Sequence, residues 1–393
     1  MKVFSNTLGI IFNIVMAPFS NISESLHNVQ KNIIEPTVQN VQENIIKPVA
    51  SIPLNLIRNR VTCSVYIVEV GGNDMQISAI PRGNCWNCCP VNLKQDVRFL
   101  FYSKSRHKSG TIINHYEGRG ALRAAGVDPL APTAIYIHGF SELSPGQSGE
   151  VIKNAYLASS TDYNFFILDW SQLSSFPWYS QAKSNVKLVA KVLSDFLETF
   201  NDSGELPIRK VHLIGFSLGA HVASFTGKSL RSGLKLKRIT ALDPAFPEFP
   251  IQDTSRRLTR SDADYIDVIH TDAGIFGIPV PLGHADFYPN EGKALQPGCQ
   301  PSYLLNEGNF VNLVVGCSHV RAWKLYAESV INMKAFPATK CKSWKGTSRV
   351  CNFSTDSYMG LANNYTHGIF YLQTKSREPY SKSVKEQISD REG

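Results

Sequence analysis

The chain has 393 residues, enough for one large domain or two modest ones. Its residues are 43% hydrophobic and 18% charged, a composition that excludes disorder as the main state. Its 40 Lys and Arg against 32 Asp and Glu give a net charge of +8, without the dense basic blocks of a nucleic-acid-binding protein. No nucleic-acid partner is therefore predicted, and the positive excess would favour peripheral contact with anionic surfaces.

The N-terminus predicts a segment that directs export. Lys2 precedes an apolar run from Val3 to Phe19, which has the length of a signal peptide, and we assign residues 1–20 to it. No other run approaches the roughly 18 apolar residues of a membrane helix, so no integral membrane domain is expected. Four Asn-x-Ser/Thr sequons agree with glycosylation on a secretory route and an extracellular location. They begin at Asn21, Asn201, Asn352 and Asn364.

A short repeat follows the apolar run. Residues 28–36 (NVQKNIIEP) return at 40–48 as NVQENIIKP, but two copies do not build a solenoid. Each Pro should end a short amphipathic turn. The polar end of the chain, from Ser376 onward, is expected to be disordered. The resulting division is 21–60 for a linker or pro-segment, 61–380 for the folded domain and 381–393 for a polar tail.

The even number of cysteines favours disulfides formed in an oxidising compartment. The eight cysteines are residues 63, 85, 88, 89, 299, 317, 341 and 351. Cys85-x-x-Cys88 is also typical of half a zinc site, yet no second Cys or His pair follows at finger spacing. We therefore predict disulfides, while the pairing among Cys63, Cys85, Cys88 and Cys89 stays open.

From about residue 90, apolar runs of strand length alternate with helical periodicity. This alternation predicts an α/β fold with a mostly parallel central sheet and helices on both faces. Apolar positions from Val186 to Phe200 recur at helical spacing and predict one buried helix face. The expected strands are 133–137, 164–168, 211–214, 239–242 and 265–269.

The strand at 211–214 leads directly into Gly215-Phe216-Ser217-Leu218-Gly219, and the next residues, AHVASFTGKSL, can begin a helix. A strand-to-helix turn this sharp needs small residues two before and two after its serine, whose hydroxyl it holds at the edge of the sheet. The helix N-terminus also favours negative charge that develops there. Ser217 is therefore the candidate nucleophile.

A serine nucleophile needs a base, and the base needs a carboxylate to orient it. Asp243 ends the next apolar strand and is the candidate carboxylate, although an Asx turn would use the same residue before Pro. The chain order Ser, Asp, His is the order of α/β-hydrolases. Spacing leaves four downstream residues open as the base, namely His270, His284, His319 and His367.

An oxyanion hole needs two backbone N–H donors. One comes from the residue after the nucleophile, here Leu218, and the other from a loop after an earlier strand. The His138-Gly139-Phe140 segment directly follows the strand at 133–137. Phe140 is the second donor that this placement predicts.

In its ordered motifs the chain resembles the pancreatic-lipase family, above all its short single-domain insect lipases and phospholipases A1. The similarity covers roughly residues 90–380. The motifs are YIHGF, FILDW, LIGFSLGAHVA, LDPAFP, YIDVIHTDAG, GHADFYPN, QPGC, CSHVRAW, MG and GIFYLQT. The resemblance implies an α/β-hydrolase fold with Ser217 as nucleophile, Asp243 as acid, His319 as base, and Phe140 and Leu218 at the oxyanion hole. Pancreatic-type chains carry a C-terminal β-sandwich, and none is expected here because only a short polar tail follows GIFYLQT.

The resemblance also implies two disulfides, Cys299–Cys317 and Cys341–Cys351. The first would enclose a lid of 17 residues, intermediate between the long lids of triacylglycerol lipases and the short lids of phospholipases. The family's structural calcium site uses carboxylates where this chain has Thr254 and Thr259. No metal is therefore predicted.

These features together predict a secreted enzyme that hydrolyses lipid acyl esters at a lipid–water interface, with triacylglycerol as the first candidate substrate. An acyl-serine mechanism requires no cofactor. One alternative is a phospholipase A1, which differs in headgroup preference. Another is a non-catalytic lipid-binding or yolk-type storage protein; such relatives lack the serine, whereas this chain has all three triad residues.

Overall fold

The computed structural model describes residues 63–70, 73–106, 110–300, 316–345, 348–351 and 354–387. The expected signal segment, the linker with its repeat and residues 301–315 of the expected lid lie outside the described residues, as do residues 388–393 of the polar tail. The described part of the chain contains the sheet, the helices and all the candidate site residues.

A single 12-stranded sheet forms the centre of the molecule, and β13 (Ser357–Tyr358) pairs beside its path with β11. It is parallel from β14 to β6, and both ends are antiparallel. The strand order is β12 (Ser348–Cys351), β11 (Pro337–Lys345), β14 (Gly368–Leu372), β10 (Ala285–Pro289), β9 (Tyr265–Ile269), β8 (Arg238–Leu242), β7 (Val211–Phe216), β5 (Thr133–Ile137), β6 (Asn164–Asp169), β3 (Arg98–Tyr102) and β4 (Thr111–Asn114). Every residue of β5, β6, β8 and β9 is buried, as expected for parallel strands covered on both faces.

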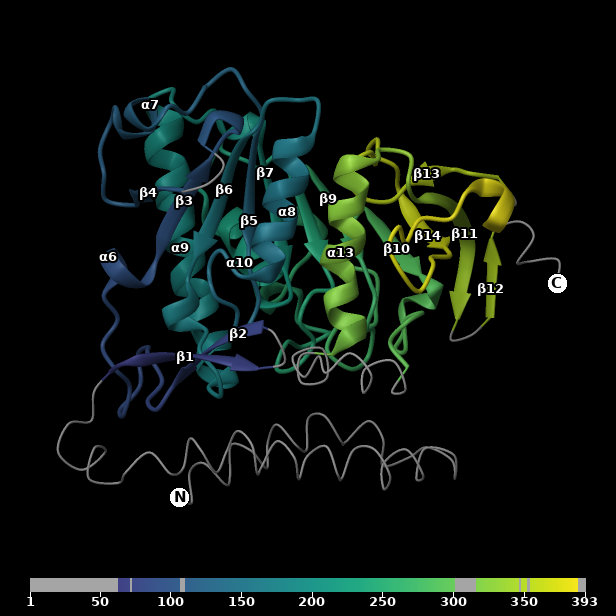
Figure 1. Ribbon diagram of the computed structural model, residues 1–393, viewed down its shortest axis with the longest axis horizontal. Coiled ribbons are helices and arrows are strands. Elements are labelled where there is room, and N and C mark those ends of the chain that lie inside the picture. The colour runs from purple at the N-terminus through teal and green to yellow at the C-terminus, as the bar shows by residue number, and fades with distance from the viewer. Residues whose placement is uncertain are drawn as a thin grey trace.

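Helices cover both faces of this sheet (Figure 1). α8 (Gln147–Ala158) packs on α13 (Cys317–Ile331), and α9 (Tyr179–Asp202) packs on α10 (Leu218–Ser229). The two pairs contribute to two separate hydrophobic clusters, one on each face. The expected α/β-hydrolase architecture is therefore confirmed. The shorter helical segments are α6 (Leu93–Asp96), α7 (Ala121–Ala125), η4 (Lys104–Arg106), η5 (Ser171–Leu173), η6 (Ile208–Lys210), η7 (Thr254–Arg256), η8 (Arg260–Asp262) and η9 (Asn290–Gly292).

A hairpin of β1 (Val65–Val70) and β2 (Asn73–Ser78) forms a second, two-stranded sheet. Disulfides join Cys63 to Cys89 and Cys85 to Cys88, which gives the pairing that the sequence left open. All eight cysteines form disulfides, as the even count predicts. The hairpin is thereby tied to the loop that leads into the main domain.

The expectation of disorder from Ser376 onward is wrong for residues 376–387. Tyr380 and Gln387 are buried, and the Glu328 carboxylate accepts hydrogen bonds from the backbone N–H groups of Tyr380 and Ser381. The side-chain amide of Gln387 donates to the carbonyl oxygen of Pro337. Composition underestimates order here because buried partners on α13 and β11 satisfy the polar groups of the segment.

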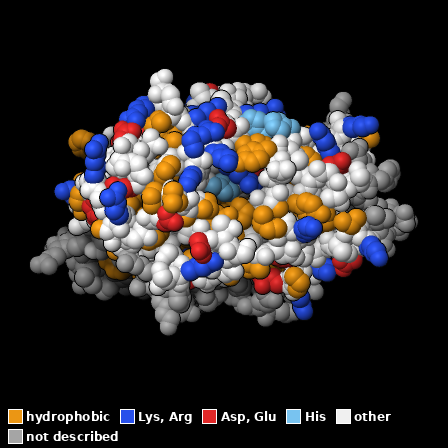
Figure 2. All heavy atoms as spheres, turned by 90° about the horizontal axis from the view of Figure 1, so that it is seen from above, with side chains coloured by type: hydrophobic (Ala, Val, Ile, Leu, Met, Phe, Trp, Pro, Cys, Tyr) orange, Lys and Arg blue, Asp and Glu red, His pale blue; other side chains and the backbone are white. Residues whose placement is uncertain are grey.

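The surface mixes charges of both signs. Viewed from above, Lys and Arg side chains lie singly or in small groups among acidic and apolar ones (Figure 2). Several basic residues are paired with carboxylates, for example Lys104 with Asp162 at 2.7 Å. Within the described residues, no helix combines the length and the apolar character needed to cross a membrane.

Replacing Phe196 by Ala should lower the free energy of unfolding by about 3–5 kcal/mol, because it removes a fully buried ring and leaves a cavity. The ring stacks on Phe99 with 3.8 Å between centroids and also contacts Phe166 and Phe200. Denaturant unfolding with the disulfides intact measures the change. Leu130→Ala is the control, because Leu130 is 80% exposed and should change stability by about 0.5 kcal/mol or less. Equal midpoints for the two variants would contradict the packing described for α9.

Candidate active site

Ser217 lies in the turn between β7 and α10. Its φ of 54° and ψ of −118° are unusual for a residue with a side chain, as expected for a sharp strand-to-helix turn. A Cβ on Gly215 would lie 2.3 Å from the carbonyl oxygen of Gly219, and one on Gly219 would lie 2.1 Å from that of Ile137. Both flanking glycines are therefore required by close backbone contacts, in agreement with the GxSxG pattern.

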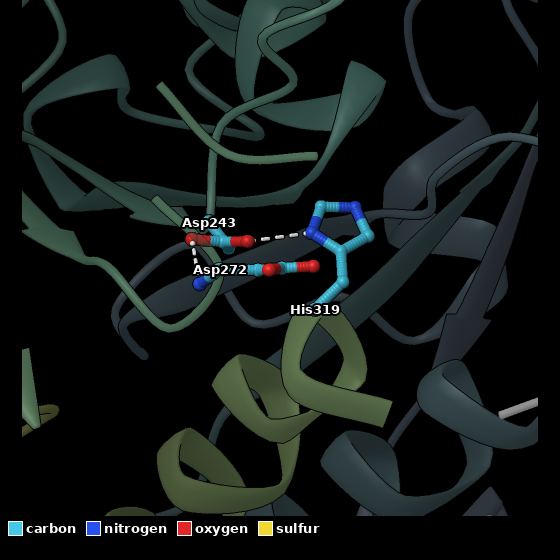
Figure 3. A group of neighbouring side chains, drawn as sticks. All are labelled: Asp243, Asp272 and His319. Carbon is cyan, nitrogen blue, oxygen red and sulfur yellow. Dashed lines mark hydrogen bonds and ion pairs between the residues drawn. The ribbon is translucent and has the colours of Figure 1, made fainter. Parts of the chain in front are cut away.

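Asp243 follows β8 and is fully buried. Its Oδ2 lies 2.6 Å from Nδ1 of His319, in the first turn of α13, as Figure 3 shows. Its Oδ1 accepts hydrogen bonds from the backbone N–H groups of Thr271 at 2.8 Å and Asp272 at 3.1 Å. The carboxylate is thus fixed through both oxygens, and Nε2 is the ring nitrogen of His319 that is left for a hydroxyl.

Phe216, the residue before Ser217, contacts His319, with 4.7 Å between the centroids of the two rings. Between these two described residues, no hydrogen bond joins the Ser217 hydroxyl to the His319 ring. Catalytic hydrogen bonds of this kind are often long without substrate and tighten when it binds. The geometry therefore brings the three predicted residues to one place, with the Asp243–His319 part already assembled.

The other three histidines that spacing left open have different partners. Both ring nitrogens of the fully buried His270 are engaged, Nε2 with Asp286 at 2.9 Å and Nδ1 with the Ile278 carbonyl at 3.1 Å. His284 accepts a hydrogen bond from the backbone N–H of Ile266, and the rings of His284 and His367 lie 5.3 Å apart. His284 and His367 therefore lie near the start of β9, whereas Asp243 accepts hydrogen bonds from residues just after the end of β9. The two histidines are at the other end of the strand from Asp243.

The two predicted oxyanion donors are both close to the turn that carries the serine. Leu218 is the first residue of α10, and Phe140 follows β5. A Cβ on Gly139 would lie 3.1 Å from Cβ of Ser217, so the loop that carries Phe140 packs directly against the nucleophile turn. Within the described chain, neither backbone N–H has a hydrogen-bond acceptor, which leaves both available to a developing oxyanion.

Asp272 is an acidic residue of this site that the sequence reasoning did not single out. It is 2% exposed, and its Oδ1 has no hydrogen-bond partner among the described residues. Burial, and then the neighbouring charge of Asp243, raises the pKa of Asp272 to about 8. The available signal was its position just after β9 in YIDVIHTDAG, because the carboxyl ends of neighbouring parallel strands meet at one edge.

Ligand atoms of Asp243, Asp272 and His319 lie within 4.8 Å of one another, the spacing of a metal-binding group (Figure 3). Both oxygens of Asp243 are already hydrogen-bonded, so a cation would compete with the bond to His319. The family's calcium site would include the position of Thr259. Here the side chain and backbone of Thr259 form a capping box with Asp262. In the described chain, no second group of three His, Cys, Asp or Glu ligands gathers there.

The structure joins Cys299 to Cys317 and Cys341 to Cys351. Cys317 is the first residue of α13, two positions before His319, so the disulfide anchors the helix turn that carries the imidazole. Cys341 and Cys351 link the neighbouring strands β11 and β12. Residues 301–315, between the first pair, are outside the described residues.

Comparison with known proteins finds a family model, described as Lipase, that matches residues 68–380. Pancreatic triacylglycerol lipase from Mus musculus is 31% identical over 339 residues, covering 79% of this chain and 69% of the relative. Phospholipase A1 member A from Pongo abelii is 32% identical, covering 67% and 56%. Inactive pancreatic lipase-related protein 1 from Homo sapiens is 34% identical, covering 64% and 55%. The chain spans about half the length of several curated relatives that it matches.

Replacing Asp272 by Asn should change how stability depends on pH. The pKa of Asp272 rises from 3.8 to about 8 on folding, so the folded state holds this proton more tightly than the unfolded state does between these values. The wild type should therefore lose stability relative to D272N as pH rises from about 4 to about 8, by up to about 1.4 kcal/mol per pH unit.

Denaturant unfolding of both proteins at a series of pH values measures this difference. Below about pH 4 and above about pH 8 the difference should be constant, because Asp272 then has the same protonation in both states. A difference that does not change across the whole range would contradict a neutral Asp272.

Proposed function

The chain belongs to the pancreatic-type lipase family, and from that premise we propose that it is a secreted lipase that hydrolyses acyl esters of lipids, with triacylglycerol as the first substrate. The observation that carries the proposal is the buried Asp243–His319 pair beside a serine on a strained strand-to-helix turn. Because the chain spans only about half the length of several relatives, the activity is argued from its own site residues.

In the proposed mechanism, Nε2 of His319 takes the proton of Ser217 while Oγ attacks the carbonyl carbon of the ester. The N–H groups of Phe140 and Leu218 stabilise the oxyanion of the tetrahedral intermediate. His319 then protonates the departing alcohol, and Asp243 stabilises the imidazolium throughout. A water molecule, deprotonated by His319, attacks the acyl-serine carbonyl, and His319 returns that proton to Oγ of Ser217 as the fatty acid leaves. No step requires a cofactor or a metal ion.

Two other functions are supported by particular observations. A relative named phospholipase A1 is 32% identical, so a phospholipid headgroup is an alternative to triacylglycerol. A relative named an inactive lipase-related protein is 34% identical, so a non-catalytic protein is another, for which we keep lipid binding or storage as the proposed role. The presence of Ser217, Asp243 and His319 together favours catalysis over the second alternative.

The pairing of all eight cysteines supports secretion, because disulfides of this number persist in oxidising compartments. A lipid–water interface is the proposed place of contact with substrate. The net charge of +8 would add attraction to anionic surfaces.

Purified protein should release fatty acid from emulsified triacylglycerol or from phosphatidylcholine, and Ser217→Ala should reduce the rate by roughly 10⁴-fold or more. The reason is that no other nucleophile lies in the turn. Titration of released acid measures both substrates and ranks them. Ser229→Ala is the matched control, because this exposed serine lies at the other end of α10. No release by the correctly folded wild type would favour the lipid-binding or storage function, and undiminished release by S217A would exclude Ser217 as nucleophile.

Expression through a secretory pathway should attach an N-glycan at Asn364, whose side chain is exposed, and not at Asn201. Asn201 lies within α9, and its side-chain oxygen accepts a hydrogen bond from the backbone N–H of Ile208. The Asn364→Gln variant should therefore lack the glycan that a glycosidase removes from this position in the wild type. The Asn201→Gln variant should still carry the glycan at Asn364. Peptide mapping by mass spectrometry distinguishes the sites, and a glycan on Asn201 would contradict the assignment.

A further inference from the structure

His138 and Trp170, from the sequence motifs YIHGF and FILDW, are two residues that have no part in the proposed mechanism. The two residues follow the neighbouring strands β5 and β6, and both are almost completely buried. The backbone N–H of Trp170 donates to Nε2 of His138 at 3.2 Å, and its indole N–H donates to the His138 carbonyl oxygen at 3.1 Å. The rings also stack, with 5.6 Å between centroids. Trp170 therefore fixes the orientation of the His138 ring.

These contacts also fix the position of the proton on His138. A backbone N–H can only donate, so Nε2 of His138 must carry a lone pair. The ring proton then lies on Nδ1, which is 2.9 Å from the carbonyl oxygen of Gly139 and donates to it. His138 is thus neutral, because a proton on both nitrogens would set two donors against each other at Nε2.

The bond to Gly139 determines where the next N–H points. The Gly139–Phe140 peptide is trans, so its C=O and its N–H point in opposite directions. Because Nδ1 of His138 holds the carbonyl oxygen, the N–H of Phe140 is directed away from the His138 ring. This peptide lies close to the serine, because Gly139 packs against Ser217.

The rest of the loop is held by other groups. The Gly139 N–H donates to Glu142 at 2.8 Å, and the Ser141 N–H donates to the Ser174 carbonyl at 2.8 Å. The Ser141 carbonyl in turn accepts from the backbone N–H of Gln76 in β2. Between these anchors, the His138 side chain is the group that fixes the Gly139–Phe140 peptide itself.

We propose that His138 is a positioning residue for the oxyanion hole: held by Trp170 in one neutral tautomer, it orients the Gly139–Phe140 peptide so that the Phe140 N–H faces the oxyanion. This inference rests on the proposed ester hydrolysis and deepens it. The hydrogen bonds of His138 go to Gly139 and Trp170, so its effect is expected on the transition state through Phe140 and not on substrate binding.

Hydrolysis of a soluble short-chain ester, p-nitrophenyl butyrate, tests the proposal with three variants. His138→Ala removes the donor to Gly139, and His138→Gln moves it to the wrong position, so kcat should fall by roughly 10²–10³-fold in both, with KM changed by less than about threefold. His138→Asn places an amide N–H near the position of Nδ1 and should restore kcat to within about tenfold of the wild type. Inactivation by a phosphonate ester, whose tetrahedral phosphorus mimics the transition state, should follow kcat.

If the wild type is active and the kcat of H138A is within about threefold of the wild-type kcat, the inference is overturned and the proposed function stays intact. H138N no better than H138A, with both folded by thermal unfolding, also overturns it. A wild type that neither hydrolyses the ester nor is labelled by the phosphonate overturns the proposed function, and this inference with it.

A measurement on the wild type does not depend on whether the variants fold. ¹⁵N NMR of histidine-labelled protein reports which ring nitrogen carries the proton, and the signal of His138 is assigned by its loss in any folded variant or by its coupling to the Trp170 amide. A protonated Nδ1 with a bare Nε2 is the expected result. The opposite tautomer, or protons on both nitrogens, would overturn the proposal.

Discussion

The hydrogen bond between Asp243 and His319 spans 76 residues of chain and depends on three separate elements. β8 delivers the carboxylate, α13 delivers the imidazole, and the segment after β9 supplies two backbone N–H groups to the carboxylate oxygen that faces away from the histidine. A buried carboxylate is stable only when its oxygens are satisfied in this way. The order of the strands β7, β8 and β9 therefore decides whether the turn with Ser217, the Asp243 carboxylate and its supporting amides can meet at one edge of the sheet.

Burial sets the protonation of the groups around this bond. Two carboxylates, those of Asp243 and Asp272, lie within a few ångströms of each other with almost no exposure to water. Low exposure and repulsion from Asp243 make a charge on Asp272 unfavourable, so the pKa of Asp272 is raised to about 8. In the loop that packs against Ser217, the Trp170 amide donates to Nε2 of His138. The two imidazoles thus have different partners: Asp243 binds Nδ1 of His319, whereas backbone groups bind both ring nitrogens of His138.

Residues near both ends of the described chain are held by partners that are far away in sequence. Gln76 in the N-terminal hairpin binds Ser141 through its backbone and Ser175 through its side chain, and the Cys63–Cys89 disulfide ties the start of this hairpin to the domain. At the other end, Glu328 and Pro337 bind the segment that contains Tyr380 and Gln387. Neither connection was predicted, because both use polar side chains and backbone groups whose partners are far away in sequence. A pattern of apolar residues carries no information about them.

The sequence by itself determined the parts of the protein that depend on local order. The central strands and α9 followed from apolar periodicity, the turn at Ser217 from glycines that close backbone contacts require, and membership of the lipase family from its ordered motifs. The tertiary structure alone decided the pairing of the four N-terminal cysteines, the place of Asp272 beside Asp243 and the orientation of His138 by Trp170. The physical reason is that pairing, desolvation and the position of a proton depend on which distant groups meet at an edge of the sheet. Those meetings are fixed by strand order and long-range packing, which no local pattern of residues encodes.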